Sequence, residues 1–221
     1  MCGKGIRKAI WRWIYPVLLY EILSFLAAFV TISIPGIREN DLSLAGILIN
    51  ALLIVPIFGY LYIQDCRRPE RLLRRQFNSP LKVYGLIWII AGSAVLAIVG
   101  NIVISLSPLV EWSSRFQETQ EAVFSGSFRM QILASVLAAP ILEEFLVRGL
   151  LYQRMRDVMG VRTAVVFSAA FFGILHGNLV QGVYAFFMGI YFAWLMERFQ
   201  NIKIPILGHM AANLAVLLLL C

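Results

Sequence analysis

Long apolar runs separated by short polar and basic segments make up most of the chain from residue 13 to residue 220. About twenty apolar residues in a helix cross the hydrocarbon core of a bilayer. On that length, the pattern predicts seven spanning helices, at residues 13–34, 42–63, 83–107, 129–150, 163–180, 182–198 and 204–220. We therefore expect an all-α, polytopic helical membrane bundle, with residues 1–221 forming a single domain.

The composition also favours a membrane protein. Hydrophobic residues make up 60% of the chain and charged residues 14%, whereas a soluble domain is roughly half apolar and a quarter charged. The net charge of +7 raises the question of nucleic acid. The basic residues fall between the apolar runs instead of clustering on one soluble face, so we expect the lipid bilayer as a partner and no nucleic acid.

The basic residues predict an orientation as well. With a cytoplasmic N-terminus, fifteen of the 19 Lys and Arg residues lie in inner segments and only Arg38, Arg115 and Arg129 lie outside, while Arg148 falls within a span. Positive charge is enriched in cytoplasmic loops, so we expect a multi-pass protein of the cell membrane with its N-terminus inside and its C-terminus outside. The first apolar run is long and contains Glu21, which indicates an uncleaved span and not a signal peptide.

Two polar segments connect the spans. The longest, residues 108–128, is interpreted as an outer connector with some interfacial helix, in preference to a cover for an entrance. The basic run "CRRPERLLRRQFNSPLK", residues 66–82, is interpreted as a solvated anchor on the anionic inner leaflet, in preference to a specific partner site. The cysteines, Cys2, Cys66 and Cys221, are scattered and predict neither a disulfide framework nor a zinc site.

The fourth apolar run contains three charges, in the stretch "PILEEFLVRG". Charged side chains inside a membrane are costly and call for internal partners or a water-filled cavity. Glu144 and Arg148 are four residues apart and share a helix face, whereas Glu143 is five residues from Arg148 and diverges from it. The spacing predicts a Glu144–Arg148 pair and leaves Glu143 as the candidate for chemistry.

Both histidines of the chain fall in later apolar runs, His176 in "FFGILHGN" and His209 in "PILGHMAANL". A single histidine on an apolar face is typical of a satisfied core residue, but two of them beside an unpaired buried carboxylate indicate a site. His209 and Asn213 share a helix face and present an imidazole and an amide to one place, which suits an oxyanion site. Gly173 and Gly177 form a small-xxx-small pattern that permits close helix packing.

The remaining polar residues of the spans lack companions at helical spacing. Glu21, Asn50 and Asn101 are interpreted as interhelical hydrogen-bonding or packing residues, although Glu21 could meet the rim of the site. Pro140 is interpreted as a packing kink just ahead of Glu143.

Taken together, "EEFLVR", "FGILH" and "HMAAN" resemble the ordered motifs EExxxR, FxxxH and HxxxN of the CAAX protease and bacteriocin-processing family, the intramembrane relatives of type II CAAX prenyl endopeptidases. The resemblance covers about residues 129–220. It implies a membrane peptidase whose site lies among helices four, five and seven and opens from within the bilayer towards the cytoplasm.

The resemblance also implies roles for single residues. Glu143 would activate the hydrolytic water, His176 would help to hold it, and His209 with Asn213 would stabilise the oxyanion. Glu144 and Arg148 would be structural or substrate-positioning, and Phe172 belongs to the second motif. The resemblance implies a glutamate-type peptidase that uses no metal or other cofactor.

The residues leave alternatives open. Zinc held by Glu143, His176 and His209 would also give a catalytic set, although no HExxH motif is present. A non-catalytic bacteriocin immunity or membrane scaffold protein could use the same cavity. The expected substrate is a peptide or protein, for example a bacteriocin or pheromone precursor or a CAAX-like chain end. Depth counting places the two histidines at different levels of the membrane.

Overall fold

The computed structural model describes residues 2–76 and 82–220, and these residues form helices and no strands. Seven long helical segments follow one another as the sequence predicted. They are α1 (Cys2–Ser33), α2 (Leu42–Cys66), α4 (Val83–Ser105), the continuous segment Phe128–Met159, α10 (Val161–Leu175), α11 (Leu179–Phe199) and α12 (Lys203–Leu220). Within the described ranges, five of these are long and apolar enough to cross a membrane, and α10 and α12 are shorter apolar helices. The all-α polytopic fold is confirmed.

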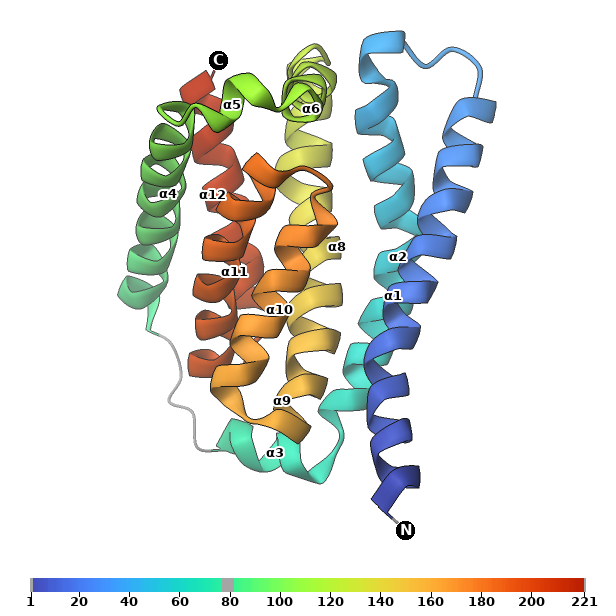
Figure 1. Cartoon of the computed structure of the whole chain (residues 1–221), viewed down its shortest axis with the longest axis vertical. Coiled ribbons are helices and arrows are strands. Elements are labelled where there is room, and N and C mark those ends of the chain that lie inside the picture. The colour runs from blue at the N-terminus through green and yellow to red at the C-terminus, as the bar shows by residue number, and fades with distance from the viewer. Residues whose placement is uncertain (1, 77–81, 221) are drawn as a thin grey trace.

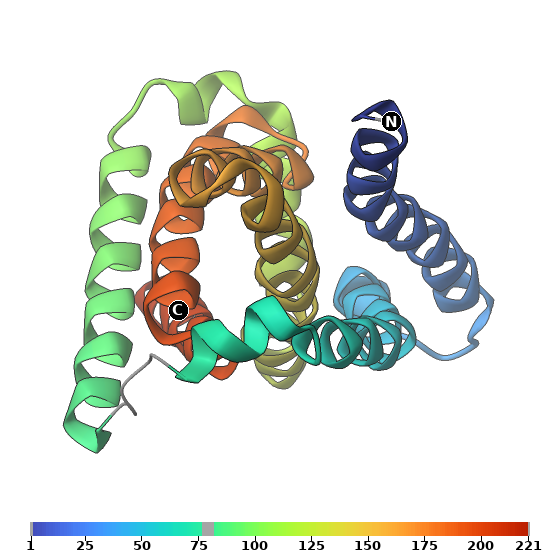
Figure 2. The same cartoon turned by 90° about the horizontal axis from the view of Figure 1, so that it is seen from below.

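The long helices run roughly side by side, and the two ends of the chain lie at opposite ends of the bundle (Figure 1). The pair α1 and α2 forms one flank, α4 forms the other, and the later helices fill the centre (Figures 1 and 2). Because the chain ends emerge on opposite sides, the arrangement is compatible with an odd number of crossings. The cytoplasmic placement of the N-terminus stays a prediction.

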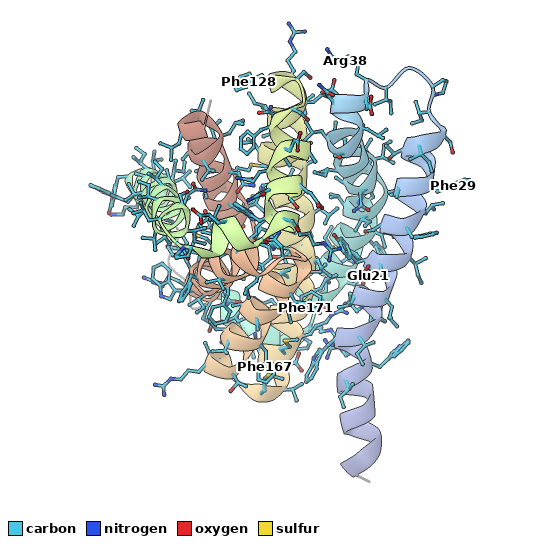
Figure 3. The ribbon with its side chains drawn as sticks, turned by 45° about the horizontal axis from the view of Figure 1, so that its top comes forward. Glu21, Phe29, Arg38, Phe128, Phe167 and Phe171 are labelled. Carbon is cyan, nitrogen blue, oxygen red and sulfur yellow. The ribbon has the colours of Figure 1, made fainter. Side chains whose placement is uncertain are left out.

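Apolar side chains fall into an inner and an outer set. The inner set packs α2, the central segment, α10 and α11 together around residues such as Phe58, Leu146 and Leu150, all with no exposed surface. The outer set lies along the flanks, where Phe29 projects away from α1 (Figure 3) and Trp88 is exposed on α4. Large exposed apolar side chains on spanning helices are what a lipid-facing surface requires.

The central segment is one helix built from alternating turn types. It comprises α7 (Phe128–Gln131), the π-helical η2 (Ile132–Ala138), α8 (Ala139–Glu144), the π-helical η3 (Phe145–Tyr152) and α9 (Gln153–Met159). The sequence predicted a span over 129–150 with a plain kink at Pro140. Instead, π turns lie on both sides of α8, and Pro140 stands at its beginning. Single π segments occur frequently at functional sites.

Helices α10 and α11 cross closely at a pair of glycines. A Cβ on Gly173 would lie 2.6 Å from the carbonyl oxygen of Gly182, so only glycine fits there. Gly177 plays a different part from the one its spacing predicted. Its φ of +69° makes the turn that ends α10 before Asn178 caps α11, and no other residue lies within 4 Å of a Cβ placed there. The fifth helix therefore ends at Leu175, five residues before the predicted boundary.

The two polar connectors are also helical. The longer one, residues 108–128, contains α5 (Leu109–Trp112) and α6 (Ser114–Phe124), which cross one end of the bundle (Figure 1). The basic connector follows α2 and forms α3 (Pro69–Gln76), which lies across the opposite end of the bundle (Figure 2). A short helical turn, η1 (Glu39–Asp41), precedes α2. Arg71 of α3 is buried, with 3% of its surface exposed, so the prediction of a purely solvated anchor is wrong at this residue.

Candidate active site

Of the three charged residues in the stretch "PILEEFLVRG", Glu144 and Arg148 form a pair and Glu143 stays outside it, as their spacing predicted. Glu144 closes α8 and Arg148 follows one turn later in η3, and Nη1 of Arg148 donates to Oε1 of Glu144 at 2.9 Å. Both side chains have no exposed surface. Nη2 of Arg148 also donates to the carbonyl oxygen of Gly189 on α11, at 3.2 Å. The pair is thus a buried, hydrogen-bonded element that ties the central segment to α11.

Aromatic rings enclose this guanidinium. The Cζ atom of Arg148 lies 4.3 Å from the ring centre of Phe172 on α10 and 5.3 Å from that of Phe192 on α11. A cation over an aromatic face is stabilised by the ring quadrupole, and more so away from water. Phe172 therefore has a structural reason to stand one turn before His176, which the sequence pattern alone did not give.

His209 contacts both carboxylates, and its contact with Glu144 is one that the sequence did not predict. Its Nδ1 lies 2.9 Å from Oε1 of Glu144, and its Nε2 lies 3.8 Å from Oε2 of Glu143. Because an ionised carboxylate can only accept, the bond to Glu144 places a proton on Nδ1 and turns Nε2 towards Glu143. Glu144 is therefore not paired with Arg148 alone. It also orients the imidazole next to the candidate base.

The ring of His209 packs against two aromatic rings. It stacks on Phe192 with ring centres 4.8 Å apart and meets the ring of Phe172 edge-on at 5.7 Å. His176 contacts the same Phe172 ring edge-on at 4.9 Å. Both histidines thus reach the level of Phe172 in the bundle, and the difference in depth that residue counting predicted is absent.

His176 stands at the end of α10, as its C-cap, and not inside a span as predicted. Its Nδ1 lies 2.8 Å from the carbonyl oxygen of Phe172. A carbonyl oxygen only accepts, so Nδ1 carries a proton, and in the neutral tautomer that fits this bond Nε2 is the acceptor. The Gly177 turn that follows allows this ring to sit at a helix end, where water reaches more easily than in the middle of a packed helix.

Asn213 lies one turn beyond His209 on α12, as the spacing predicted. Its Nδ2 donates to the carbonyl oxygen of Ser135 in η2 at 2.8 Å. The bond commits one of its two amide hydrogens to the π-helical turn ahead of α8. The other polar positions of the carboxamide remain available to a group in the neighbouring cavity.

Glu143, His176, His209 and Asn213 all line one cavity of about 290 Å³. The Glu143 side chain is 25% exposed, in contrast to the fully covered Glu144. A cavity of this size holds several waters or part of a peptide. The four residues that the motifs singled out therefore share a wall of one space, and the adjacent Glu144 and Arg148 lie behind it.

Other polar residues of the cavity wall were not singled out by sequence. Asn101 of α4 was interpreted as a packing residue but lines the cavity, together with Gln181 of α11 and with Thr119 and Gln120 of α6. The helix α6 is thus part of the cavity wall, and the interpretation of residues 108–128 as a plain connector is wrong. A lone asparagine in an apolar span was the signal that could have indicated Asn101.

The remaining intramembrane polar residues lie elsewhere. Asn50 donates to Ser24 at 3.0 Å, which confirms a hydrogen bond between α2 and α1. Glu21 is exposed about midway along α1 (Figure 3) and is not among the residues that line the cavity.

The donor arrangement bears on the zinc alternative. Within residues 2–76 and 82–220, no group of three or more His, Cys, Asp and Glu side chains is placed to hold a metal ion. In addition, Nδ1 of each histidine already has a protein acceptor. A metal at Glu143, His176 and His209 would have to use the two Nε2 atoms and bring these side chains closer to one centre.

The fold and the cavity define a class: a multi-pass helical membrane protein with a polar, carboxylate- and histidine-lined site inside its bundle. Comparison with known proteins shows which family the chain resembles. The family model described as "Type II CAAX prenyl endopeptidase Rce1-like" matches residues 125–215. This confirms the resemblance to the CAAX protease and bacteriocin-processing family, and the matched range contains all three motifs.

A relative from Bacillus subtilis (strain 168) is named "Putative membrane peptidase YdiL". It is 27% identical over 153 residues, which cover 68% of this chain and 62% of that protein. The chain thus spans less than two thirds of this relative. No solved structure matches the chain.

Proposed function

We propose that this chain is an intramembrane endopeptidase that hydrolyses a peptide bond with a water activated by Glu143. The observation that carries the proposal is the shared cavity, where one partly exposed carboxylate, two imidazoles and a carboxamide meet. The match to a family of membrane peptidases supports the same class of activity.

The geometry suggests how the residues divide the work. A water between Glu143 and Nε2 of His176 would meet two acceptors, and Glu143 takes its proton as the water oxygen attacks the peptide carbonyl carbon. The oxyanion that forms faces the amide of Asn213 and Nε2 of His209. Glu143 then returns the proton to the leaving nitrogen as the carbon–nitrogen bond breaks.

The protonation of His209 follows from its neighbours. One proton is committed to Glu144 through Nδ1, so Nε2 can donate to an oxyanion only when the ring carries both protons. Glu144 stabilises such an imidazolium, and Arg148 holds Glu144 in place. We propose that Glu144 and Arg148 act as positioning residues and not as the base.

We propose a peptide or membrane-associated protein as the substrate. The cavity wall is mostly apolar, with residues such as Ile104, Phe116 and Met188 beside the polar group. It would accept an apolar stretch of chain and present its carbonyl to Glu143. A secreted peptide precursor or a CAAX-like chain end fits this description. We keep the cell membrane, with a cytoplasmic N-terminus, as the proposed location.

Peptides released from membranes test the proposal. Membranes that contain the intact chain are compared by mass spectrometry with membranes that contain Glu143→Gln, and Glu21→Gln serves as the matched control because it removes an intramembrane carboxylate outside the cavity. We expect peptides that disappear in Glu143→Gln and persist in Glu21→Gln. Identical peptides from all three membranes, at equal protein levels, would count against the proposal.

The zinc alternative has its own measurement. A metal-free glutamate mechanism predicts that cleavage survives prolonged treatment with a chelator and that purified protein contains no stoichiometric zinc. Loss of cleavage on chelation, restored by zinc alone, would favour the metal-dependent enzyme instead. An immunity or scaffold protein would keep its protective or binding effect in Glu143→Gln.

A further inference from the structure

A second group of charges, none of which lines the cavity, lies on and around α3, the helix that crosses the end of the bundle (Figure 2). Five arginines surround two aspartates there. Asp65 at the end of α2 contacts Arg12, Arg68, Arg71 and Arg154, and Asp157 of α9 contacts Arg12, Arg71 and Arg74. We call these seven residues the basic cluster. Five positive charges against two negative charges leave an excess of three.

Part of the basic cluster is fully satisfied. Arg154 donates from Nε to Asp65 at 2.5 Å, from Nη1 to the carbonyl oxygen of Arg12 at 2.7 Å and from Nη2 to the hydroxyl of Tyr15 at 2.8 Å. Arg74 donates to Asp157 and to Gln153. These two arginines use up the best acceptor positions of the two carboxylates.

Arg71 is left without hydrogen bonds. Its side chain is 4% exposed, and its guanidinium approaches Asp65 and Asp157 only to 3.6 and 3.5 Å. All three of its nitrogens lack a hydrogen-bond acceptor in the described part of the chain. Burial lowers the pKa of this guanidinium, and Asp65 and Asp157 act in the opposite direction. Arginine nevertheless stays cationic in proteins, so Arg71 is an undersatisfied buried charge.

Arg12 on α1 resembles Arg71, because it also lies near both aspartates and has nitrogens without a hydrogen-bond acceptor in the described residues. Its Nη2 lies 3.8 Å from both Asp65 and Asp157, and its Nε and Nη2 lack acceptors in the described ranges. The side chains of Arg12 and Arg68 are 27% and 40% exposed, so the basic cluster is open to the outside at these two residues. Guanidinium groups on four elements, α1, α3, α9 and the turn between α2 and α3, thus converge on Asp65.

The sequence offers no further acid to balance the basic cluster. The chain has twelve Asp and Glu residues. Besides Asp65 and Asp157, the ones near this end of the bundle are Glu70 and Glu197. Glu197 accepts two hydrogen bonds from Arg156 and one from Tyr152, and Glu70 is exposed on α3. Residues 1 and 77–81, which lie outside the described ranges, include no acid. The missing negative charge therefore has to come from outside the chain.

We propose that the basic cluster binds a phosphate group at the membrane surface through Arg12, Arg68 and Arg71. Phosphate matches the donors because guanidinium groups bind its oxygens in pairs, and its charge offsets the excess. The site lies at the end of spanning helices, where lipid headgroups are found, so the phosphate belongs either to an anionic lipid or to a free ion. The proposal is independent of the peptidase activity.

Binding to the purified full-length chain in a neutral detergent tests the proposal. The probes are dioctanoyl phosphatidylglycerol, its zwitterionic counterpart dioctanoyl phosphatidylcholine, and inorganic phosphate. Melting temperature and native mass spectrometry report binding. We expect phosphatidylglycerol to bind and raise the melting temperature more than phosphatidylcholine does. An equal effect of inorganic phosphate would identify the free ion as the source, and no effect of it would identify the lipid.

Variants locate the site. Arg71→Gln and Arg12→Gln should each weaken binding about tenfold, since each removes charge-assisted hydrogen bonds. Arg67→Gln is the matched control, because Arg67 is exposed beside the basic cluster and its side chain is not among the ion-pair partners of Asp65 and Asp157 in the described residues. If Arg71→Gln does not fold, binding to Arg12→Gln tests the proposal instead, because the Arg12 side chain is partly exposed. The proposal is overturned if the intact chain binds no phosphate probe, or if Arg12→Gln and the control bind as well as the intact chain.

Discussion

Two buried arginines of this protein stand in opposite situations. Arg148, with no exposed surface, donates from Nη1 to a carboxylate at 2.9 Å and from Nη2 to a carbonyl at 3.2 Å and lies against two aromatic rings, so that among the described residues Nε is its one nitrogen without an acceptor. Arg71, with 3% exposed, has two carboxylates at 3.5 to 3.6 Å and no hydrogen bond within the described residues. Burial alone therefore does not show whether a charged side chain has enough hydrogen-bond partners. The hydrogen bonds that the side chain makes show this.

The difference separates two kinds of site. Around Arg148 the chain supplies its own counter-charge, and the result is a rigid support that orients His209 beside Glu143. Around Arg71 the chain supplies too little negative charge, and the result is a place for an external anion. In the proposed function, the first arrangement supports chemistry inside the bundle, and in the further proposal the second binds an anion at its surface.

The largest expected effect on stability is at Arg148. Arg148→Met leaves Glu144 buried without its main partner, and breaking a buried ion pair from one side costs about 3–5 kcal/mol. We expect much less folded protein in the membrane and a markedly lower melting temperature. Folded yield and melting temperature equal to those of the intact chain would contradict the assigned role.

Removing both partners should cost less than the two single changes suggest. In Glu144→Gln with Arg148→Met no buried charge is left alone, so we expect a coupling of about 1–3 kcal/mol in a double-mutant cycle of unfolding free energies. His209 would lose its charged partner in the same variant, so cleavage should fall even where folding recovers. Additive effects would indicate that the pair does not act as a unit.

A glycine next to Arg148 gives a smaller, steric test. A Cβ on Gly189 would lie 3.0 Å from Cα of Ala169 and 3.4 Å from Nη2 of Arg148. Gly189→Ala should therefore lower stability by about 1–3 kcal/mol through overpacking. Gly59→Ala on α2 is the control, because its Cβ would meet only Phe145 at 4.0 Å. Equal melting temperatures for the two variants would show that this crossing tolerates the extra carbon.

The smallest effect is expected at Arg71. Arg71→Met removes an undersatisfied cation, so without an added anion we expect the unfolding free energy to change by no more than about 1 kcal/mol, in either direction. The same substitution at Arg148 serves as the comparison. Losses of similar size at both positions would remove the distinction between the two arginines.

The sequence predicted the parts of this structure that depend on local spacing. Hydropathy placed the seven long helices, and the interval of four residues predicted the Glu144–Arg148 bond. The contact between His209 and Glu144 depends on how α12 is rotated against α8, which spacing within one helix does not specify. The sequence therefore assigned Glu144 only one partner.

Other features depend on backbone geometry or on distant partners. The π turns flanking α8 have no distinct hydropathy pattern, so the span was drawn as a regular helix. His176 was placed inside a span because the apolar run continues past it, whereas the positive φ of Gly177 ends α10. Arg71 was placed on the surface because its neighbours in sequence are basic, whereas Asp65 and Asp157 draw it inward.

The most direct test of the central claim is the cleavage rate of purified, folded Glu143→Gln on a peptide released only by the intact chain. Without the base, we expect the rate to fall by at least about a hundredfold, with melting temperature unchanged, since general-base catalysis contributes about 10²–10⁴-fold. A rate within a few-fold of that of the intact chain would contradict the account, because the activated water would then not depend on Glu143.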